Sequence, residues 1–303
     1  MKTITCIANF KDGDSIQGFY LCVEKHLRHT RSGDLFLDLH LRDKTGSING
    51  KIWDNVDKLN EKFNAGDPVA ISGNVDSFRE KPQLIIKKIN RASVQYYGRY
   101  GYDPSLIVPA SSKNPNDMWK AITKIIRSIK SNPLRKLVSM IYRENKGILM
   151  VHPASVKTHH NYRSGFIEHV LSMAEIADQL VVHYQLDRDL LLAGVFLHDI
   201  GKIFEISSDF EAGYTDEGNF IGHIVIGRDI MRSAAKKIKN FPEDIQIKLE
   251  HMILSYRGKY ELQSLKKPKI REPQWYKASC ACTYIIPKGF VLVRVGYGRR
   301  PTT

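Results

Sequence analysis

The sequence contains 303 residues, of which 42% are hydrophobic and 26% charged, enough for two globular domains with apolar cores. No run of about eighteen apolar residues is present, and residues 1–11 lack the apolar centre of a secretory signal. We therefore expect no membrane partner and a cytoplasmic location. The formal net charge of +14 favours polyanionic partners such as nucleic acid but excludes no fold.

Residues 1–92 carry the short alternating apolar segments of a β domain. Strands are predicted at 15–23, 35–41, 47–53, 68–75 and 83–89, and turn residues separate them. A short helix is predicted at 56–63, between the third and fourth strands. Five strands with this helix are the plan of an OB-fold barrel, so residues 1–92 are predicted to be an OB-fold nucleic-acid-binding domain.

The second half of the chain has the period of helices. Residues 93–116 are rich in Gly, Pro, Ser and Tyr and predict a linker. Apolar residues then recur at helical spacing, and helices are expected at 165–184, 188–199, 220–238 and 242–255. The predicted fold is therefore multidomain α+β: an N-terminal five-stranded OB-fold β-barrel followed by an all-α bundle over 117–270. Residues 271–303 break the pattern, which leaves two interpretations: a genuine extension, or a frame-shifted or replaced end.

Metal-capable side chains recur inside the apolar helical segments. They are His169, His198, Asp199, His223 and His251. A single histidine in a helix is more often a core or surface residue, but four predicted helices of one bundle can direct such a series at a common centre. Burying imidazole and carboxylate together costs several kcal/mol unless a partner compensates. We therefore predict a site for a divalent cation, and these ligand types suit Mn²⁺, Fe²⁺, Zn²⁺ or Mg²⁺.

The order of these residues resembles that of the HD superfamily of metal-dependent phosphohydrolases, and residues 193–202 match its central motif. Together with the predicted barrel, with His159-His160-Asn161-Tyr162 and with residues 217–223, the chain resembles the YhaM-type 3′-to-5′ exoribonucleases over about residues 15–270. The resemblance implies an OB-fold followed by an HD domain that holds Mn²⁺. The implied metal ligands are His169, His198, Asp199 and His223, with His251 as a ligand or as support for one. The implied catalytic residues are Asp199, which could also orient the attacking water, and Lys202, which would meet the scissile phosphate.

The sequence departs from the family pattern at two places. Tyr256-Arg257 stands where relatives carry a pair of histidines, and no aspartate follows Asp244, although the family has a late aspartate that ligates the metal. The departures keep a second hypothesis open, a nucleic-acid-binding protein whose HD domain is degenerate and inactive. A third hypothesis is a phosphohydrolase of small nucleotides.

Aromatic and cationic residues alternate in the predicted barrel. The candidate nucleic-acid-binding residues are Arg28, Arg31, Lys51, Trp53, Phe78, Arg79 and Lys81. Aromatic rings stack on bases, and cations track the phosphates. The alternation does not decide whether Phe36 faces the core or the solvent. The leading prediction is a metal-dependent 3′-to-5′ exonuclease acting on single-stranded RNA, with DNA and homo-oligomers left open.

Overall fold

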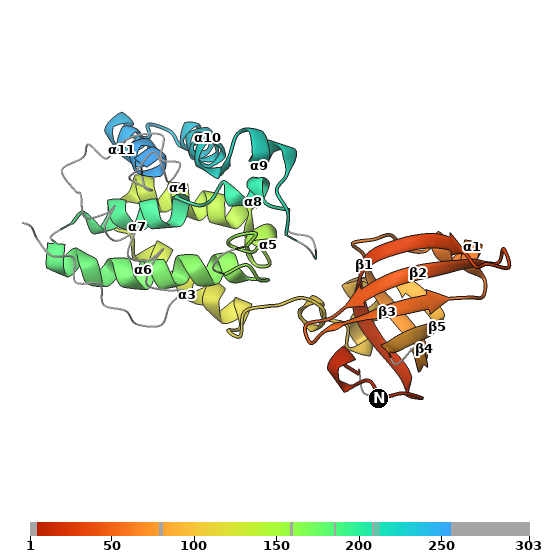
Figure 1. Cartoon of the computed structure of the whole chain (residues 1–303). Coiled ribbons are helices and arrows are strands. Elements are labelled where there is room, and N and C mark those ends of the chain that lie inside the picture. The colour runs from red at the N-terminus through yellow and green to blue at the C-terminus, as the bar shows by residue number, and fades with distance from the viewer. Residues whose placement is uncertain are drawn as a thin grey trace, which may run out of the picture. The chain divides into compact units, whose positions relative to one another are not determined.

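The computed structural model describes residues 5–78, 81–157, 160–184, 186–207, 210 and 212–255. They divide into two compact units, each visible in Figure 1. The barrel unit extends to Ser111 and takes in the described residues of Ser208–Ala212; the helical unit contains the rest. The predicted combination of an N-terminal barrel and a helical domain is confirmed.

The barrel unit is a closed barrel with the strand order β1-β2-β3-β5-β4. Its strands are β1 Ser15–His29, β2 Leu35–Arg42, β3 Ser47–Ile52, β4 Pro68–Phe78 and β5 Lys81–Arg91; the turn η1 Ile7–Asn9 precedes them and the helix α1 Val56–Asn60 follows β3. Neighbouring strands are antiparallel except for β3 and β5, which are parallel. This is the predicted OB-fold plan.

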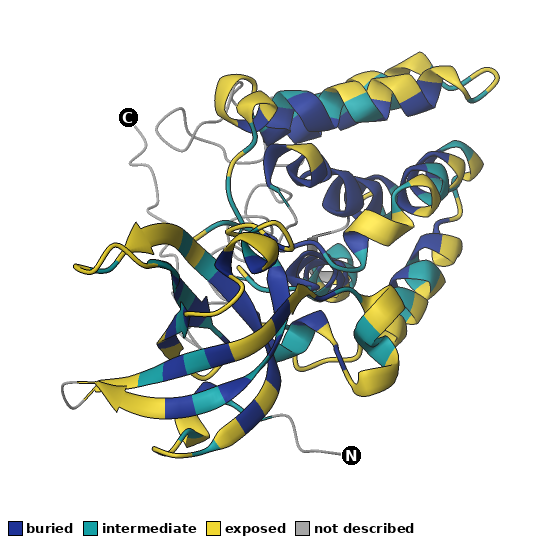
Figure 2. Ribbon diagram, turned by 90° about the vertical axis from the view of Figure 1, so that its right-hand side faces the viewer, coloured by how far each residue is buried: buried dark blue, intermediate teal, exposed yellow. Residues whose placement is uncertain are grey.

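Alternation along the strands builds the barrel core, as the alternating colours of the strands in Figure 2 illustrate. On β2, Leu37, Leu39 and Leu41 are buried in the interior. Phe36 has the opposite parity, is half-buried, and stacks on Trp53 with ring centroids 4.8 Å apart. The structure thus settles the orientation that the sequence left open: Phe36 lies on the outer face.

The segment for which the composition predicts a linker, residues 93–116, differs from that expectation. It contains helix α2 Val94–Tyr97 and the turns η2 Gly98–Tyr100 and η3 Pro104–Leu106. Phe19 points out of the barrel and is buried with Ala92, Tyr102, Ile107 and Val108 in a small second core. Burial of these apolar side chains keeps a loop-like sequence packed on the barrel.

The helical unit begins at α3 Pro115–Ser128, which Asn114 caps through its side chain. The other helices are α4 Asn132–Glu144, α5 Lys146–Leu149, α6 Gly165–Tyr184, α7 Arg188–Leu197, α8 Lys202–Glu205, α9 Asp216–Phe220, α10 His223–Lys236 and α11 Glu243–Ser255. None of the helices in the described part of the chain has the length and apolar content that a bilayer crossing requires.

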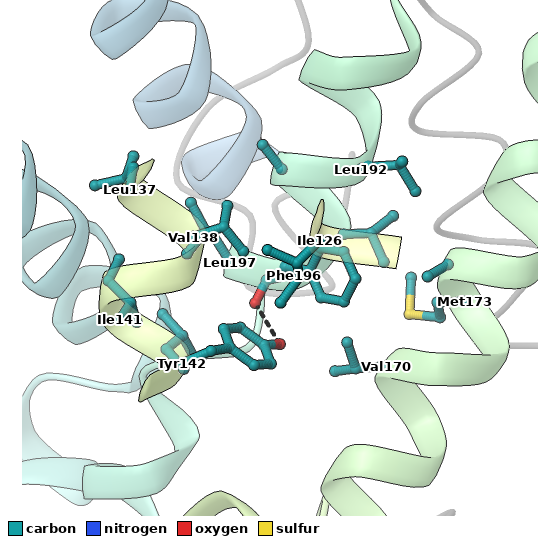
Figure 3. Packing of buried hydrophobic residues seen from close by; sticks show 14 of the residues in the cluster. Ile126, Leu137, Val138, Ile141, Tyr142, Val170, Met173, Leu192, Phe196 and Leu197 are labelled. Carbon is teal, nitrogen blue, oxygen red and sulfur yellow. Dashed lines mark hydrogen bonds between the residues drawn. The ribbon is translucent and has the colours of Figure 1, made fainter. Parts of the chain in front are cut away.

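One apolar core joins these helices. In Figure 3, Ile126 of α3, Val138 of α4, Val170 of α6 and Phe196 of α7 converge on a common centre. The buried hydroxyl of Tyr142 on α4 donates a hydrogen bond of 2.9 Å to the carbonyl of Phe196. This bond fixes the end of α7, directly before His198 and Asp199, against the core.

The prediction of a single helix at 220–238 is wrong in one respect, because the structure has a break between two helices there. Helix α9 ends at Phe220 and α10 begins at His223, and Gly222 between them has a φ of +78°. That left-handed backbone conformation favours glycine and cannot continue a helix. The break places His223 at the first turn of α10. Arg79, His159, Tyr256-Arg257 and the tail 271–303 lie outside the described residues.

Candidate metal centre

The centre is organised around Asp199, which follows His198 directly after α7. Both side chains are buried. The Nε2 atom of His198 lies 3.1 Å from Oδ2 of Asp199. The other ring nitrogen, Nδ1, lies 2.8 Å from the carbonyl of Val195 one turn earlier. A carbonyl only accepts, so Nδ1 donates this hydrogen bond, and Nε2 is the ring nitrogen that faces Asp199.

His169 reaches the same carboxylate from α6. Its Nε2 atom lies 3.6 Å from Oδ2 of Asp199, and its ring is 5.7 Å from the ring of His198 between centroids. Burial lowers the pKa of His169 from 6.5 to about 4, although Asp199 opposes the shift. The imidazole is therefore neutral near pH 7, which is the form that ligates metals.

His223 approaches Asp199 from α10, with its Nε2 atom 3.6 Å from Oδ1. Glu205 of α8 orients it: Oε1 accepts from Nδ1 of the ring at 2.7 Å and from the backbone N–H of His223 at 3.0 Å. Burial alone would raise the pKa of Glu205, but its contacts with His223 outweigh burial and lower that pKa. A carboxylate behind a histidine is the usual arrangement for a metal-ligating imidazole. The sequence analysis missed Glu205, whose only signal was a carboxylate in an apolar turn.

Lys202 is buried, and its ammonium donates to Oδ2 of Asp199 at 2.7 Å. Burial would raise the pKa of Asp199, but the charges of His198 and Lys202 and hydrogen bonds from His169 and His198 hold it well below its usual range. Asp199 is therefore ionised at neutral pH. Lys202 faces the centre rather than solvent, and it is within reach of whatever binds to Asp199.

A close approach of two backbones joins the turn at residues 198–201, which we call the HD turn, to α10. A Cβ atom at Gly201 would lie 2.0 Å from the carbonyl oxygen of His223 and 2.6 Å from the backbone nitrogen of Gly227. Any side chain at this position would force the segments apart, because nonbonded heavy atoms do not approach so closely. Gly201 thus sets the separation between Asp199 and His223.

Three of these side chains could hold one divalent cation. The ligand atoms of His169, His198 and Asp199 all lie within 4.8 Å of one another. Two ligand atoms bound to one ion at about 2.1 Å each are at most about 4.2 Å apart, and the separations of 3.1 and 3.6 Å from Asp199 satisfy that limit. His223 stands beside this group. His251 is half-buried on α11, and its predicted role stays a prediction.

An open cavity of about 440 Å³ borders the centre at His223 and Glu205. Phe220 and Tyr214 also line it, and their side chains are largely exposed. These two aromatic residues were not among the predicted site residues. Their exposure beside buried metal-capable groups became visible only with the folded helical unit.

On the barrel unit, several predicted nucleic-acid-binding residues share the outer face of β1, β2 and β3. Lys51 and Arg28 pair with Asp38 at 2.6 and 3.2 Å, and Lys51 also lies over the ring of Phe36. Trp53 follows β3 and stacks on Phe36. Arg31 is exposed in the β1–β2 turn.

Phe78 and Lys81 lie elsewhere, at the β4–β5 hairpin. Because Gln83 pairs with Asn49, this hairpin is level with the start of β3, whereas Trp53 follows its end. The predicted residues therefore form two groups separated along β3. Nucleic-acid contact by either group stays a prediction.

Comparison with known families agrees with both units. Residues 22–92 match the OB-fold nucleic acid binding domain, and residues 166–281 match the HD domain. The chain therefore joins a segment that matches the OB-fold nucleic acid binding domain to a segment that matches the HD domain.

Solved structures supply further likenesses. The second OB-fold domain of replication protein A from Methanococcus maripaludis is 20% identical, covers 30% of this chain and 96% of its own, and has a TM-score of 0.26. The mitochondrial single-stranded DNA binding protein of S. cerevisiae is 14% identical, covers 27% of this chain and 98% of its own, and has a TM-score of 0.23.

Proposed function

We propose that the protein is a metal-dependent phosphodiesterase that removes nucleotides from the 3′ end of single-stranded RNA. The observation that carries this proposal is the buried group of His169, His198 and Asp199 in a chain that also contains an OB-fold barrel. Mn²⁺ is the proposed ion, with Mg²⁺, Fe²⁺ and Zn²⁺ as other candidates for this donor set.

The side chains would divide the work as follows. His169, His198 and Asp199 hold the ion, and His223, oriented by Glu205, completes its surroundings. A divalent ion lowers the pKa of a coordinated water and withdraws charge from phosphoryl oxygens. Lys202 turns its ammonium from Asp199 to the phosphate oxygens and offsets the charge that develops there. Phe220, exposed at the cavity beside His223, offers its ring to the terminal base.

The barrel would supply affinity for the rest of the strand. Trp53 and Phe36 offer a stacking surface, and Lys51 and Arg28 stand beside it. The Lys51 ammonium and the Arg28 guanidinium both form ion pairs with Asp38. Phosphates would therefore compete with this one carboxylate for the two cations. Such contacts make affinity decrease as salt rises.

The test uses purified full-length protein that has been stripped with EDTA and reloaded with MnCl₂. With a 5′-labelled single-stranded RNA, we expect a ladder of products shortened from the 3′ end, dependent on added metal. Asp199→Ala and His198→Ala should each lower the rate by at least about a hundredfold, because each removes a ligand. Unchanged cleavage by both variants would exclude the proposed centre.

A second candidate function has one observation in its favour. The sequence has no aspartate after Asp244, and Lys202 already neutralises Asp199. A protein that binds nucleic acid through the barrel without turning it over would be compatible with both features. Tight RNA binding without metal-stimulated cleavage in the same preparations would favour it over the nuclease.

A further inference from the structure

A cavity of the barrel unit lies away from the face that carries Trp53. Its volume is about 870 Å³, within the range of about 300–1,000 Å³ that is typical of small-molecule sites. Strands β1, β4 and β5 form its floor, and the segment Val94–Tyr100 forms a wall. We call it the tyrosine pocket, after Tyr96, Tyr97 and Tyr100, which line it.

Aromatic rings line the tyrosine pocket from its buried floor to its exposed edge. At its floor the buried ring of Phe19 meets Tyr97 edge-on, with centroids 5.8 Å apart. Tyr97 in turn lies 6.3 Å from Tyr100. The outer rings are exposed, Tyr96 by 67% and Tyr100 by 58%. Large exposed aromatic surfaces beside a cavity are costly in water and indicate a partner that covers them.

The charge of the tyrosine pocket is entirely of one sign. Lys88, Arg91 and Arg99 line it, and no acidic residue does so among the described lining residues. Arg91 pairs with Asp67 at 3.0 Å, whereas Lys88 has no ion pair within the described part of the chain. Arg99 lies over the ring of Tyr100 at 4.8 Å, a position that leaves its guanidinium edge open to an anion.

The barrel topology makes this a separate site. The candidate nucleic-acid-binding rings and cations around Trp53 belong to β2, β3 and the end of β1. Strands β4 and β5 are not neighbours of β2 in the closed order β1-β2-β3-β5-β4. A strand bound on the β2–β3 face would therefore leave the tyrosine pocket uncovered.

We infer that the tyrosine pocket is a second nucleotide-binding site, in which a base stacks on Tyr96 or Tyr100 while Lys88 and Arg99 meet its phosphate. The inference rests on the proposed nucleic-acid binding by the barrel, but not on nuclease activity. Because stacking does not depend on which base is bound, the site would accept any base. The polar side chains of Gln17 and Asn90 also line the pocket. The site would engage nucleotides of a strand that passes round the barrel.

The test measures binding by the full-length protein in EDTA, so that no cleavage interferes. The probe is a fluorescein-labelled oligouridylate of about twelve nucleotides. The double variant Tyr96→Ala/Tyr100→Ala should raise Kd about tenfold, the effect expected for the loss of a base stack. The matched control, Tyr96→Phe/Tyr100→Phe, keeps both rings and should stay within about twofold of the unmodified protein.

Photocrosslinking of the same probe, carrying 4-thiouridine, locates the contact. We expect crosslinked peptides that contain the segment Val94–Tyr100 in addition to any that contain Trp53. Competition by uridine monophosphate would assign the site to free nucleotides, and resistance to it would assign the site to a strand. Unchanged Kd in the alanine variant, with crosslinks confined to the Trp53 face, would overturn the inference while leaving the proposed function intact. Absence of RNA binding by the unmodified protein would overturn both.

Discussion

Two histidines of the centre are each fixed at the ring nitrogen that faces away from Asp199. Val195 holds His198 through a carbonyl of the same helix, and Glu205 holds His223 through a carboxylate of a different helix. A backbone partner cannot be removed by substitution, but Glu205 can. The two histidines therefore respond differently to mutation, and Glu205 is the more informative target.

Glu205→Gln should weaken Mn²⁺ binding by about 10–100-fold, because an amide holds the His223 ring less firmly and makes its Nε2 atom less basic. Isothermal titration of the EDTA-stripped protein with MnCl₂ would measure the change. Glu217→Gln, at an exposed position of α9, is the control and should bind as the unmodified protein does. Equal affinities for the two variants would remove Glu205 from the centre.

The buried imidazole of His169 predicts a pH dependence of the metal-free protein. Its pKa is about 4 in the folded chain against 6.5 ordinarily, so between these values the unfolded chain binds a proton that the folded chain does not. The free energy of unfolding should therefore fall as pH decreases from about 6.5 to about 4. His152, whose pKa burial also lowers, adds to the same trend. Asp199 acts with the same sign, but only below about pH 4, as it becomes protonated.

Urea denaturation at several pH values between 4.5 and 6.5 would measure this dependence. His169→Gln should flatten the curve by the share of one proton, because glutamine does not titrate. A variant curve parallel to that of the unmodified protein would mean that His169 is solvated.

The identities of most residues at the centre could be predicted from the sequence, because imidazoles and a carboxylate inside apolar helical segments require a partner. Glu205 could not, since its contact with His223 joins residues 18 positions apart through a turn whose path the sequence does not specify. Phe220 was not predicted as a site residue for a related reason. An exposed ring becomes a site residue only when the cavity next to it is known.

At the scale of elements, the approach of the HD turn to α10 depends on one missing side chain. Gly201→Ala should lower the free energy of unfolding by about 1–3 kcal/mol, because its Cβ would press on the backbone of His223 and Gly227. It should also weaken metal binding by moving His223 away from Asp199. Chemical denaturation and metal titration measure the two effects.

Gly147→Ala is the matched control. Gly147 lies in the short helix α5, and a Cβ there would meet nothing within 4 Å. The substitution should be neutral or stabilise by up to about 1 kcal/mol, through the lower entropy of the unfolded chain. If both variants lost stability equally, the cost at Gly201 would not come from its neighbours.

Strands and long helices were predictable because their apolar periods differ, and α6 begins and ends where the pattern predicts. Two elements were not. The interruption before His223 depends on the backbone conformation of Gly222, which a hydrophobic pattern does not reveal. The segment after the barrel has the composition of a linker, yet the outward ring of Phe19 gives it a surface to pack on.

At the scale of the molecule, the two units have separate apolar cores. The helical core draws its buried residues from Met118 to Ile253, and the main barrel core from Ile7 to Ile89. Removal of residues 1–111 should therefore leave a folded helical unit that binds Mn²⁺ and hydrolyses bis(p-nitrophenyl) phosphate.

The truncated protein should, however, bind RNA at least about tenfold more weakly, since it lacks the barrel's rings and cations. Circular dichroism, the model substrate and a gel-shift assay would separate these effects. Turnover of free nucleotides that is unaffected by the truncation would instead favour the small-nucleotide phosphohydrolase.

The ammonium of Lys202 beside Asp199 means that the centre carries an internal counter-ion. Proteins whose clustered ligands have no such companion often collapse when chelators strip them. Folding and metal loading should therefore be separable: EDTA should leave the circular dichroism spectrum unchanged, whereas metal-free Lys202→Met should melt at a lower temperature than the metal-free unmodified protein and should gain more from added Mn²⁺. A cell could thus accumulate the finished fold in advance and let the supply of ions decide when it becomes active.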